Sequence, residues 1–228
     1  MASETGRKVR DGMLHAAVGL LNDHGPDALQ TRKVAGAAGT STMAVYTHFG
    51  GMRALIAEVA EEGLRQFDAA LTVPQTTDPV ADLFAMGSAY RRYAIERPHM
   101  YRLMFGSTSA HGINAPAHNV LTQPVAEIEQ HYPAFAHLVR AVRRSMQAGR
   151  ISAGAVGSAA DDTAVVATAA QFWALIHGFV MLELAGYYGN DGAAVEPVLG
   201  TMTSNLLVAL GDSPERVQES LRSAADAG

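Results

Sequence analysis

Residues 31–49 place side chains suited to DNA contact at helical spacing. The segment holds a cationic pair, Arg32 and Lys33, and ends in Tyr46-Thr-His48-Phe. Guanidinium, ammonium, phenol and imidazole groups can all donate hydrogen bonds to phosphate oxygens. Such bonds fix a protein's register on a duplex without selecting its sequence. The segment therefore predicts a surface that holds a nucleic-acid backbone.

A second group in the same segment has the chemistry of base contact. Thr42, Met43, Ala44 and Thr47 fall on the predicted exposed face and N-terminal half of a short helix. A hydroxyl can either donate to or accept from a base edge, and Met43 or Ala44 can contact a thymine methyl group. These residues are predicted to select the DNA sequence.

The elements that must position these groups are short helices separated by glycine. A helix is predicted over 31–38, with Thr31 as its N-cap, followed by a turn at Gly39 and a second helix that ends at His48. Ser41 or Thr42 is expected to cap the second helix. Predicted buried positions are Val34, Ala38, Val45 and Phe49. Longer amphipathic helices are predicted on either side, over 7–23 and 52–71.

This order of elements is that of a helix-turn-helix, and residues 7–64 resemble the bacterial TetR-type transcriptional regulators. The strings Thr31-Arg-Lys-Val-Ala35 and Val45-Tyr-Thr-His48, separated by Gly39, carry the resemblance. Where that family usually places a lysine, this chain has Met52, and Arg53 is the expected substitute. The resemblance implies DNA contacts from Thr31, Arg32, Lys33, Ser41, Thr42, Met43, Ala44, Tyr46, Thr47, His48 and Arg53.

Composition and charge fit a small DNA-binding domain on a larger helical body. The chain has 228 residues, 48% of them apolar, and no cysteine, which excludes disulfides and thiolate metal sites. Its net charge is −5, yet residues 1–55 carry +2 and the remainder −7. This asymmetry favours a basic domain that binds nucleic acid. The predicted division is 1–52 for the helix-turn-helix domain and 53–228 for effector binding and dimerisation.

The rest of the chain also predicts helices, and no alternating strand pattern of useful length occurs. The expected helices span 79–96, 98–105, 119–131, 133–148, 161–186, 195–210 and 214–224. The fold class is therefore all-α. Residues 164–182 carry no charge over nineteen positions, but no Lys or Arg anchors either end. A doubly buried helix is favoured over a membrane span, and a cytoplasmic protein without a secretory signal is expected.

The helix over 161–186 is apolar on nearly every side, so both of its faces must be covered. One face is expected to meet its own core and the other a second subunit, although a central helix of a monomer would show the same pattern. Predicted pairing residues are Phe172, Ile176, Phe179, Val180, Val198, Met202 and Leu206. Trp173, His177 and Gly178 also resemble a tryptophan-histidine-glycine motif of one branch of the TetR family.

The middle helices are rich in aromatic residues and methionine, which suit an apolar ligand cavity with a few polar groups. Plain core packing is the alternative for each of these residues. The predicted ligand contacts are Tyr90, Tyr93, Met100, Met104, Phe105, Phe135, Gln171, Trp173 and His177.

Other chemistries leave no signature. His111, His118, His131 and His137 have no i, i+4 pairing, and no nucleophile elbow, phosphate loop or dinucleotide motif occurs. No enzyme activity, metal or cofactor is expected. The predicted function is a homodimeric regulator, a repressor that a small, largely apolar effector releases from a palindromic double-stranded operator. The alternatives are a structural interaction module, or a small-molecule-binding protein or enzyme that retains a helix-turn-helix domain.

Overall fold

The computed structural model describes residues 4–105, 119–152 and 161–226. These residues form helices and connecting turns with no strand among them, as the sequence predicted. They divide into two compact units, Met1–Gln66 with Glu96–Pro116, and Phe67–Ile95 with Ala117–Gly228. Each unit is described by itself.

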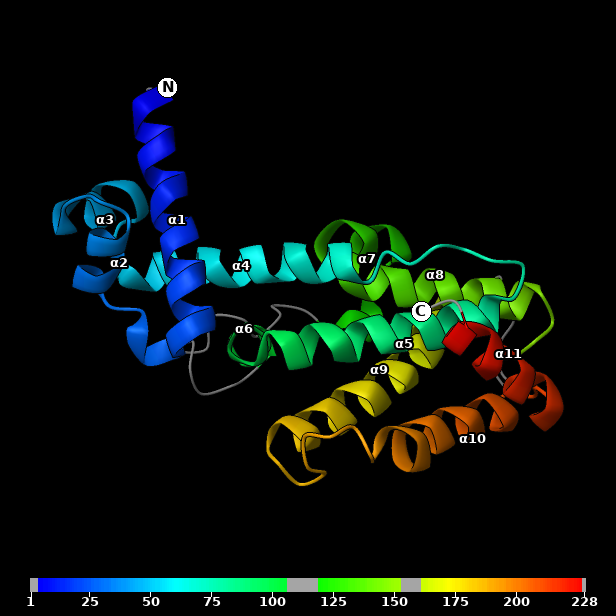
Figure 1. The fold of residues 1–228 in the computed structure, drawn as a ribbon. Helices are drawn as coiled ribbons and strands as arrows, with labels where there is room; N and C mark the ends of the chain where they lie inside the picture. Colours follow the sequence, from blue (N-terminus) through cyan, green and yellow to red (C-terminus); the bar gives the residue numbers. More distant parts are fainter. Residues whose placement is uncertain (1–3, 106–118, 153–160, 227–228) are drawn as a thin grey trace. The chain divides into compact units, whose positions relative to one another are not determined.

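The first unit is built from the N-terminal helices, drawn in blue to cyan in Figure 1, and from α6. Its helices are α1 (Glu4–His24), the 3-10 turn η1 (Pro26–Ala28), α2 (Thr31–Ala37), α3 (Thr42–Phe49), the first part of α4 (Met52–Ala70) and α6 (Pro98–Phe105). The buried positions of α1 are Met13, Ala17 and Leu21, which recur every four residues. This stripe packs on α2, α3 and α6, so α1 is the scaffold of the unit.

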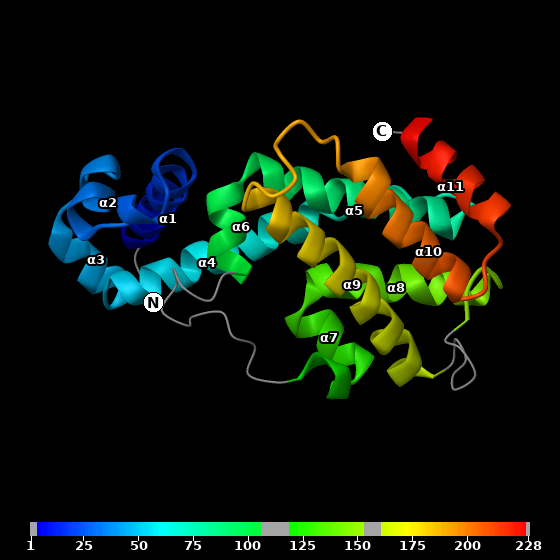
Figure 2. The ribbon, with the colours of Figure 1, turned by 90° about the horizontal axis from the view of Figure 1, so that it is seen from below.

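The second unit contains α5 and the C-terminal helices. They are α5 (Pro79–Glu96), η2 (Val120–Thr122), α7 (Val125–His131), α8 (Pro133–Gln147), α9 (Asp162–Leu184), η4 (Val195–Gly200), α10 (Thr201–Ala209) and α11 (Pro214–Asp226). Helix α9 packs against α8 and also contacts α10 (Figure 2). By length and composition α9 passes the test for a membrane span, alone among the described helices, but the core helix of a soluble protein passes it too.

A buried ionic cluster ties the start of α5 to the C-terminal part of the chain. The Arg150 side chain contacts Asp78 at 2.6 Å and Asp212 at 2.8 Å, and it donates to the Ser220 hydroxyl at 2.9 Å. Burial alone would raise the pKa of Asp78, but the pKa is lowered overall. The hydrogen bond from the Ser220 hydroxyl contributes most, followed by the Ala81 and Val80 N–H groups and by the charge of Arg150. The pairing satisfies a charge that would be costly to bury alone, and it anchors α11.

Three predicted details differ in the structure. Thr31 is the first residue of α2, not its N-cap, because Gln30 is the cap residue and makes no side-chain cap bond. The helix predicted over 119–131 is interrupted at Pro124, because Gln123 before it takes an extended conformation. The helix predicted over 195–210 begins with a wide turn in which the Thr201 N–H donates to the Glu196 carbonyl, five residues back.

Candidate nucleic-acid interface

Helix α3 is held at both ends by local interactions that the sequence encodes. Gly39 has φ +64°, a left-handed conformation that forms the turn before the helix. The Ser41 hydroxyl then accepts from the Ala44 N–H at 3.3 Å, which confirms Ser41 as the cap. At the other end Gly50, with φ +76°, donates to the Tyr46 carbonyl. The helix therefore has a defined length and direction.

Only two positions of α3 are buried, and the others form an exposed face. Val45 and Phe49 pack into the core of the first unit. Met43 is 68% exposed and Tyr46 57% exposed. Ser41, Thr42 and Thr47 are exposed as well, whereas Ala44 and His48 are partly buried. The predicted contact residues thus share one accessible surface on a capped helix.

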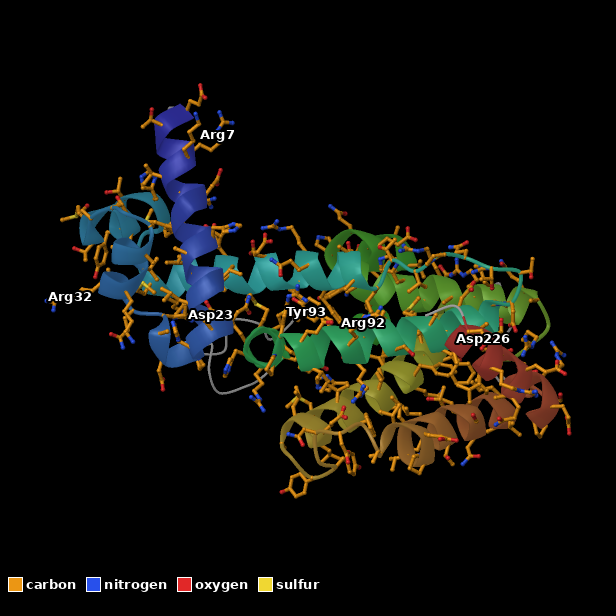
Figure 3. All side chains as sticks on the ribbon, viewed as in Figure 1. Arg7, Asp23, Arg32, Arg92, Tyr93 and Asp226 are labelled. Carbon is orange, nitrogen blue, oxygen red and sulfur yellow. The ribbon has the colours of Figure 1, made fainter. Side chains whose placement is uncertain are left out.

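The predicted cations near α3 form none of the ion pairs found within the described residues. Arg32, Lys33 and Arg53 are exposed, and Thr31 before them is partly exposed. Figure 3 shows Arg32 pointing away from α2. None of the ion pairs found within the described residues includes any of these three cations. Their charge is available to an external anion.

The sequence did not single out Arg10, which braces the helix-turn-helix. Its guanidinium lies 2.5 Å from a Glu58 carboxylate oxygen and 5.1 Å from the centre of the Phe49 ring. One side chain of α1 thus contacts both α3 and α4. Its position three residues before the buried Met13, at the edge of the packed stripe, is the signal that points to this role.

The second unit brings five aromatic side chains and one histidine ring into one continuous series. The Phe67 ring lies 4.9 Å from Tyr90 and 5.1 Å from Tyr93. The Tyr90 hydroxyl lies 3.3 Å from His177 Nδ1. The series continues through His177 to Trp173, and from Trp173 to Phe135 at 5.2 Å. Five predicted ligand contacts, on α5, α8 and α9, therefore belong to this series: Tyr90, Tyr93, Phe135, Trp173 and His177.

Burial lowers the pKa of His177 below its ordinary value, because removal from water disfavours the charged imidazolium. At neutral pH the ring is therefore neutral. Next to a phenol hydroxyl, a neutral imidazole can both donate and accept a hydrogen bond. The series therefore combines apolar ring faces with a small polar group.

Comparison with protein families identifies the chain. The family model for bacterial regulatory proteins of the tetR family matches residues 13–59, and the model for the tetracyclin repressor-like C-terminal domain matches 83–206. The second match alone covers more than half of the chain. The chain belongs to the TetR family. It is therefore a transcriptional regulator with a DNA-binding helix-turn-helix.

Solved structures show the same fold along nearly the whole chain. A protein of unknown function from Rhodococcus sp. RHA1 is 26% identical, with a TM-score of 0.64 over 90% of this chain and 96% of that one. RolR in complex with resorcinol is 13% identical, with a TM-score of 0.63 over 96% and 95%. A TetR variant from Acinetobacter baumannii AYE in complex with minocycline is 19% identical, with a TM-score of 0.55 over 86% and 93%. No curated protein sequence matches this chain significantly.

Three predicted ligand contacts of this TetR-family chain lie in the first unit. Met100 and Met104 are buried on α6, and Phe105 is partly buried against Tyr101. A Cβ atom at Gly63 of α4 would lie 2.5 Å from Met100 Sδ and 2.9 Å from Met104 Sδ. A larger residue at position 63 would force the Met100 and Met104 side chains to shift. This packing explains the two methionines without a ligand.

The predicted pairing residues divide between the core and the surface. Phe172, Ile176, Phe179 and Val180 are at most 8% exposed within one protomer, whereas Met202 is 45% exposed. Val198 and Leu206 are partly exposed. Beyond its first turn, the exposed residues of α9 form a separate stripe that sequence periodicity does not distinguish from the buried face. It consists of Ala167, Gln171, Ala174, Gly178 and Leu182.

This exposed stripe of α9 is made largely of small residues. A Cβ atom added at Gly178 meets no heavy atom within 4 Å. Gln171, a predicted ligand contact, lies on this stripe and is exposed. The tryptophan-histidine-glycine branch stays a prediction, although Trp173 and Gly178 fall within the matched C-terminal region.

No group of three metal-ligating side chains occurs within the described part of the chain. Of the histidines weighed as ligands, His111 and His118 lie outside the described residues. His137 instead contacts Asp68 at 2.9 Å, and the Glu127 carbonyl lies 3.0 Å from His131 Nδ1. Both of these side chains thus have protein partners.

Proposed function

We propose that this regulator is a repressor that binds a palindromic operator through α3 and is released by a small, largely apolar ligand. The exposed face of α3 carries the proposal, because a large apolar side chain, Met43, stands in solvent there. Arg32 and Lys33 of α2 and Arg53 of α4 are exposed as well. An apolar surface on a capped helix, with cations on the adjoining helices in the chain, matches the major groove with its flanking phosphates.

The contacts divide by chemistry. Base edges are assigned to Thr42, Met43, Ala44 and Thr47. Phosphates are assigned to the remaining polar and cationic residues, which are Thr31, Arg32, Lys33, Ser41, Tyr46, His48 and Arg53. Tyr46, which is 57% exposed, is expected to contribute to affinity for every sequence rather than to selection.

Dimerisation is assigned to the exposed stripe of α9 together with α10. Small residues on α9 allow two helix backbones to approach closely. Val198 of η4 and Met202 and Leu206 of α10 provide larger apolar contacts. Two such helix pairs form a four-helix bundle around a two-fold axis. A symmetric dimer then presents two copies of α3 to two half-sites.

The effector is assigned to the aromatic series of the second unit. Tyr90, Tyr93, Phe135, Trp173 and His177 offer ring faces and one polar pair, which suit a small aromatic molecule with a hydroxyl group. Resorcinol, bound by RolR, is a suitable first probe. An effector acts only through different affinities for two arrangements of the dimer. Helix α4 contributes residues to both units of the chain and is the proposed transmitter of the change.

The experiment is a gel shift with DNA that flanks the coding region. A discrete band that weakens steeply as salt rises supports the proposal, because phosphate contacts release counterions. Tyr46→Ala should weaken binding to all DNA alike, while Thr42→Ala should alter sequence preference. Absence of a band with DNA that contains the operator would contradict DNA binding. The alternative of an enzyme or carrier would then be favoured.

Operator DNA in a bacterium also implies the cytoplasm as the site of action.

A further inference from the structure

Helix α3 lacks the side chains that make two hydrogen bonds to one base. Residues 41–49 contain no Arg, Lys, Asn, Gln, Asp or Glu. Recognition of guanine commonly uses Arg or Lys, recognition of adenine uses Asn or Gln, and cytosine is recognised by Asp or Glu. Base selection by this helix must therefore rest on other groups.

Two of the hydroxyl groups at the exposed face are already used within the helix. The Ser41 hydroxyl accepts from the Ala44 N–H, and the Thr47 hydroxyl donates to the Met43 carbonyl at 3.1 Å. Neither bond needs DNA, so neither group has to turn toward a base. The hydrogen-bonding capacity of the face is thereby reduced further.

What the face offers is apolar surface. Met43 is the most exposed large apolar residue of the helix, at 68%, and Thr42 and Thr47 beside it each carry a methyl group. In the major groove the only apolar group of the four bases is the C5 methyl group of thymine. Water is displaced favourably when two apolar surfaces meet there.

We propose that this protein recognises its half-site through thymine methyl groups, with Met43 as the main contact. The inference rests on the proposed DNA binding and adds the chemical feature that is selected. A cytosine methylated at C5 presents the same group and should be accepted at a position where only the methyl group is contacted.

The experiment uses the flanking DNA amplified once with dTTP and once with dUTP, which removes every thymine methyl group without changing base pairing. Each lost methyl contact should weaken binding by a factor of about four, and one such contact in each half-site of a palindrome multiplies the two losses to a factor of about fifteen. The wild-type protein should therefore bind the uracil duplex roughly ten-fold or more weakly.

Variants of the full-length protein assign the effect to Met43. Met43→Ala should lose most of the thymine-to-uracil ratio, while Met43→Leu, which keeps an apolar side chain, should retain it. Tyr46→Phe is the matched control, because a lost phosphate contact weakens binding to both duplexes and leaves the ratio unchanged. Met43 is exposed, so these changes should leave folding intact.

The outcomes separate the two proposals. If neither duplex is bound, the proposed function fails. If both duplexes are bound equally, DNA binding stands and methyl recognition is overturned. A ratio that persists in Met43→Ala would also overturn the assignment, because uracil would then act through the shape of the duplex.

Discussion

Helices α3 and α9 both present surface to solvent, but they expose opposite kinds of side chain. Helix α3 exposes large groups, Met43 and Tyr46, and buries only two of its residues. Helix α9 buries most of its large apolar residues and exposes a stripe in which Ala167, Ala174 and Gly178 are joined by Gln171 and Leu182. Large exposed groups can enter a groove, whereas small ones let another backbone approach. The contrast supports the proposal that α3 meets DNA and that α9 meets a second subunit.

The largest expected effect comes from blocking the α9 stripe. Gly178→Arg places a long cation where the helix of a second subunit is proposed to pack, while no heavy atom of the protomer lies within 4 Å of the new Cβ. The variant should be monomeric by sedimentation. A monomer has only one helix-turn-helix domain, so its operator affinity should be lower by about a hundred-fold or more. Gly178→Ala keeps the surface small and should remain dimeric. A dimeric Gly178→Arg variant would reject this face.

The next effect concerns the packing of α6 on α4. Gly63→Val would force a side chain against the fully buried Met100, since the Cβ position lies 2.5 Å from its sulfur. Overpacking of this kind costs about 2 kcal/mol of unfolding free energy. Urea unfolding measures the loss. Gly19→Ala, with no heavy atom within 4 Å, should be neutral or stabilising. Equal stability of both variants would show that the close approach is absent.

A smaller loss of stability is expected when Arg10, which contacts both α3 and α4, is replaced. Arg10→Met removes the contact with Glu58 and the cation above Phe49. Both charged groups are partly exposed, so the loss of stability should be about 1 kcal/mol or less. A double-mutant cycle with Glu58→Gln isolates the ion pair. Additive effects of the two changes would show that the pair makes no net contribution.

The smallest expected effect is a pH dependence of the unfolding free energy that arises from His177. Burial lowers the pKa of this side chain. The unfolded chain gains a proton near pH 6.5, whereas the folded chain gains it only at lower pH. Unfolding free energy should therefore fall as pH drops below about 6.5 and should level off below the folded pKa. His177→Gln should flatten this part of the curve. Trp173, the chain's single tryptophan, lies 6.4 Å from His177 and provides a fluorescence signal. An identical pH profile for the variant would contradict the assignment.

Sequence patterns predicted the helix-turn-helix closely, because its determinants are local. Ser41, Gly39 and Gly50 act on residues within four positions, and the buried Val45 and Phe49 follow helical spacing. The order of the helices in the body was predicted for the same reason. The interruption at Pro124 was missed, although proline restricts the residue before it.

Contacts between distant segments were harder to predict. Helix α9 is apolar on nearly every side, so its periodicity did not separate the face that contains Phe172 from the one that contains Gly178. The pairing of Arg10 with Glu58 and the packing of Met100 on Gly63 join residues 48 and 37 positions apart. Each depends on tertiary geometry that no local pattern contains.

The central claim is that two exposed copies of α3 recognise two half-sites of one operator. A hydroxyl-radical footprint on the bound flanking DNA tests this most directly. The account predicts two protected patches related by two-fold symmetry, with centres about one helical turn (34–36 Å) or a multiple of it apart. A single protected patch, or uniform protection without sequence preference, would contradict it.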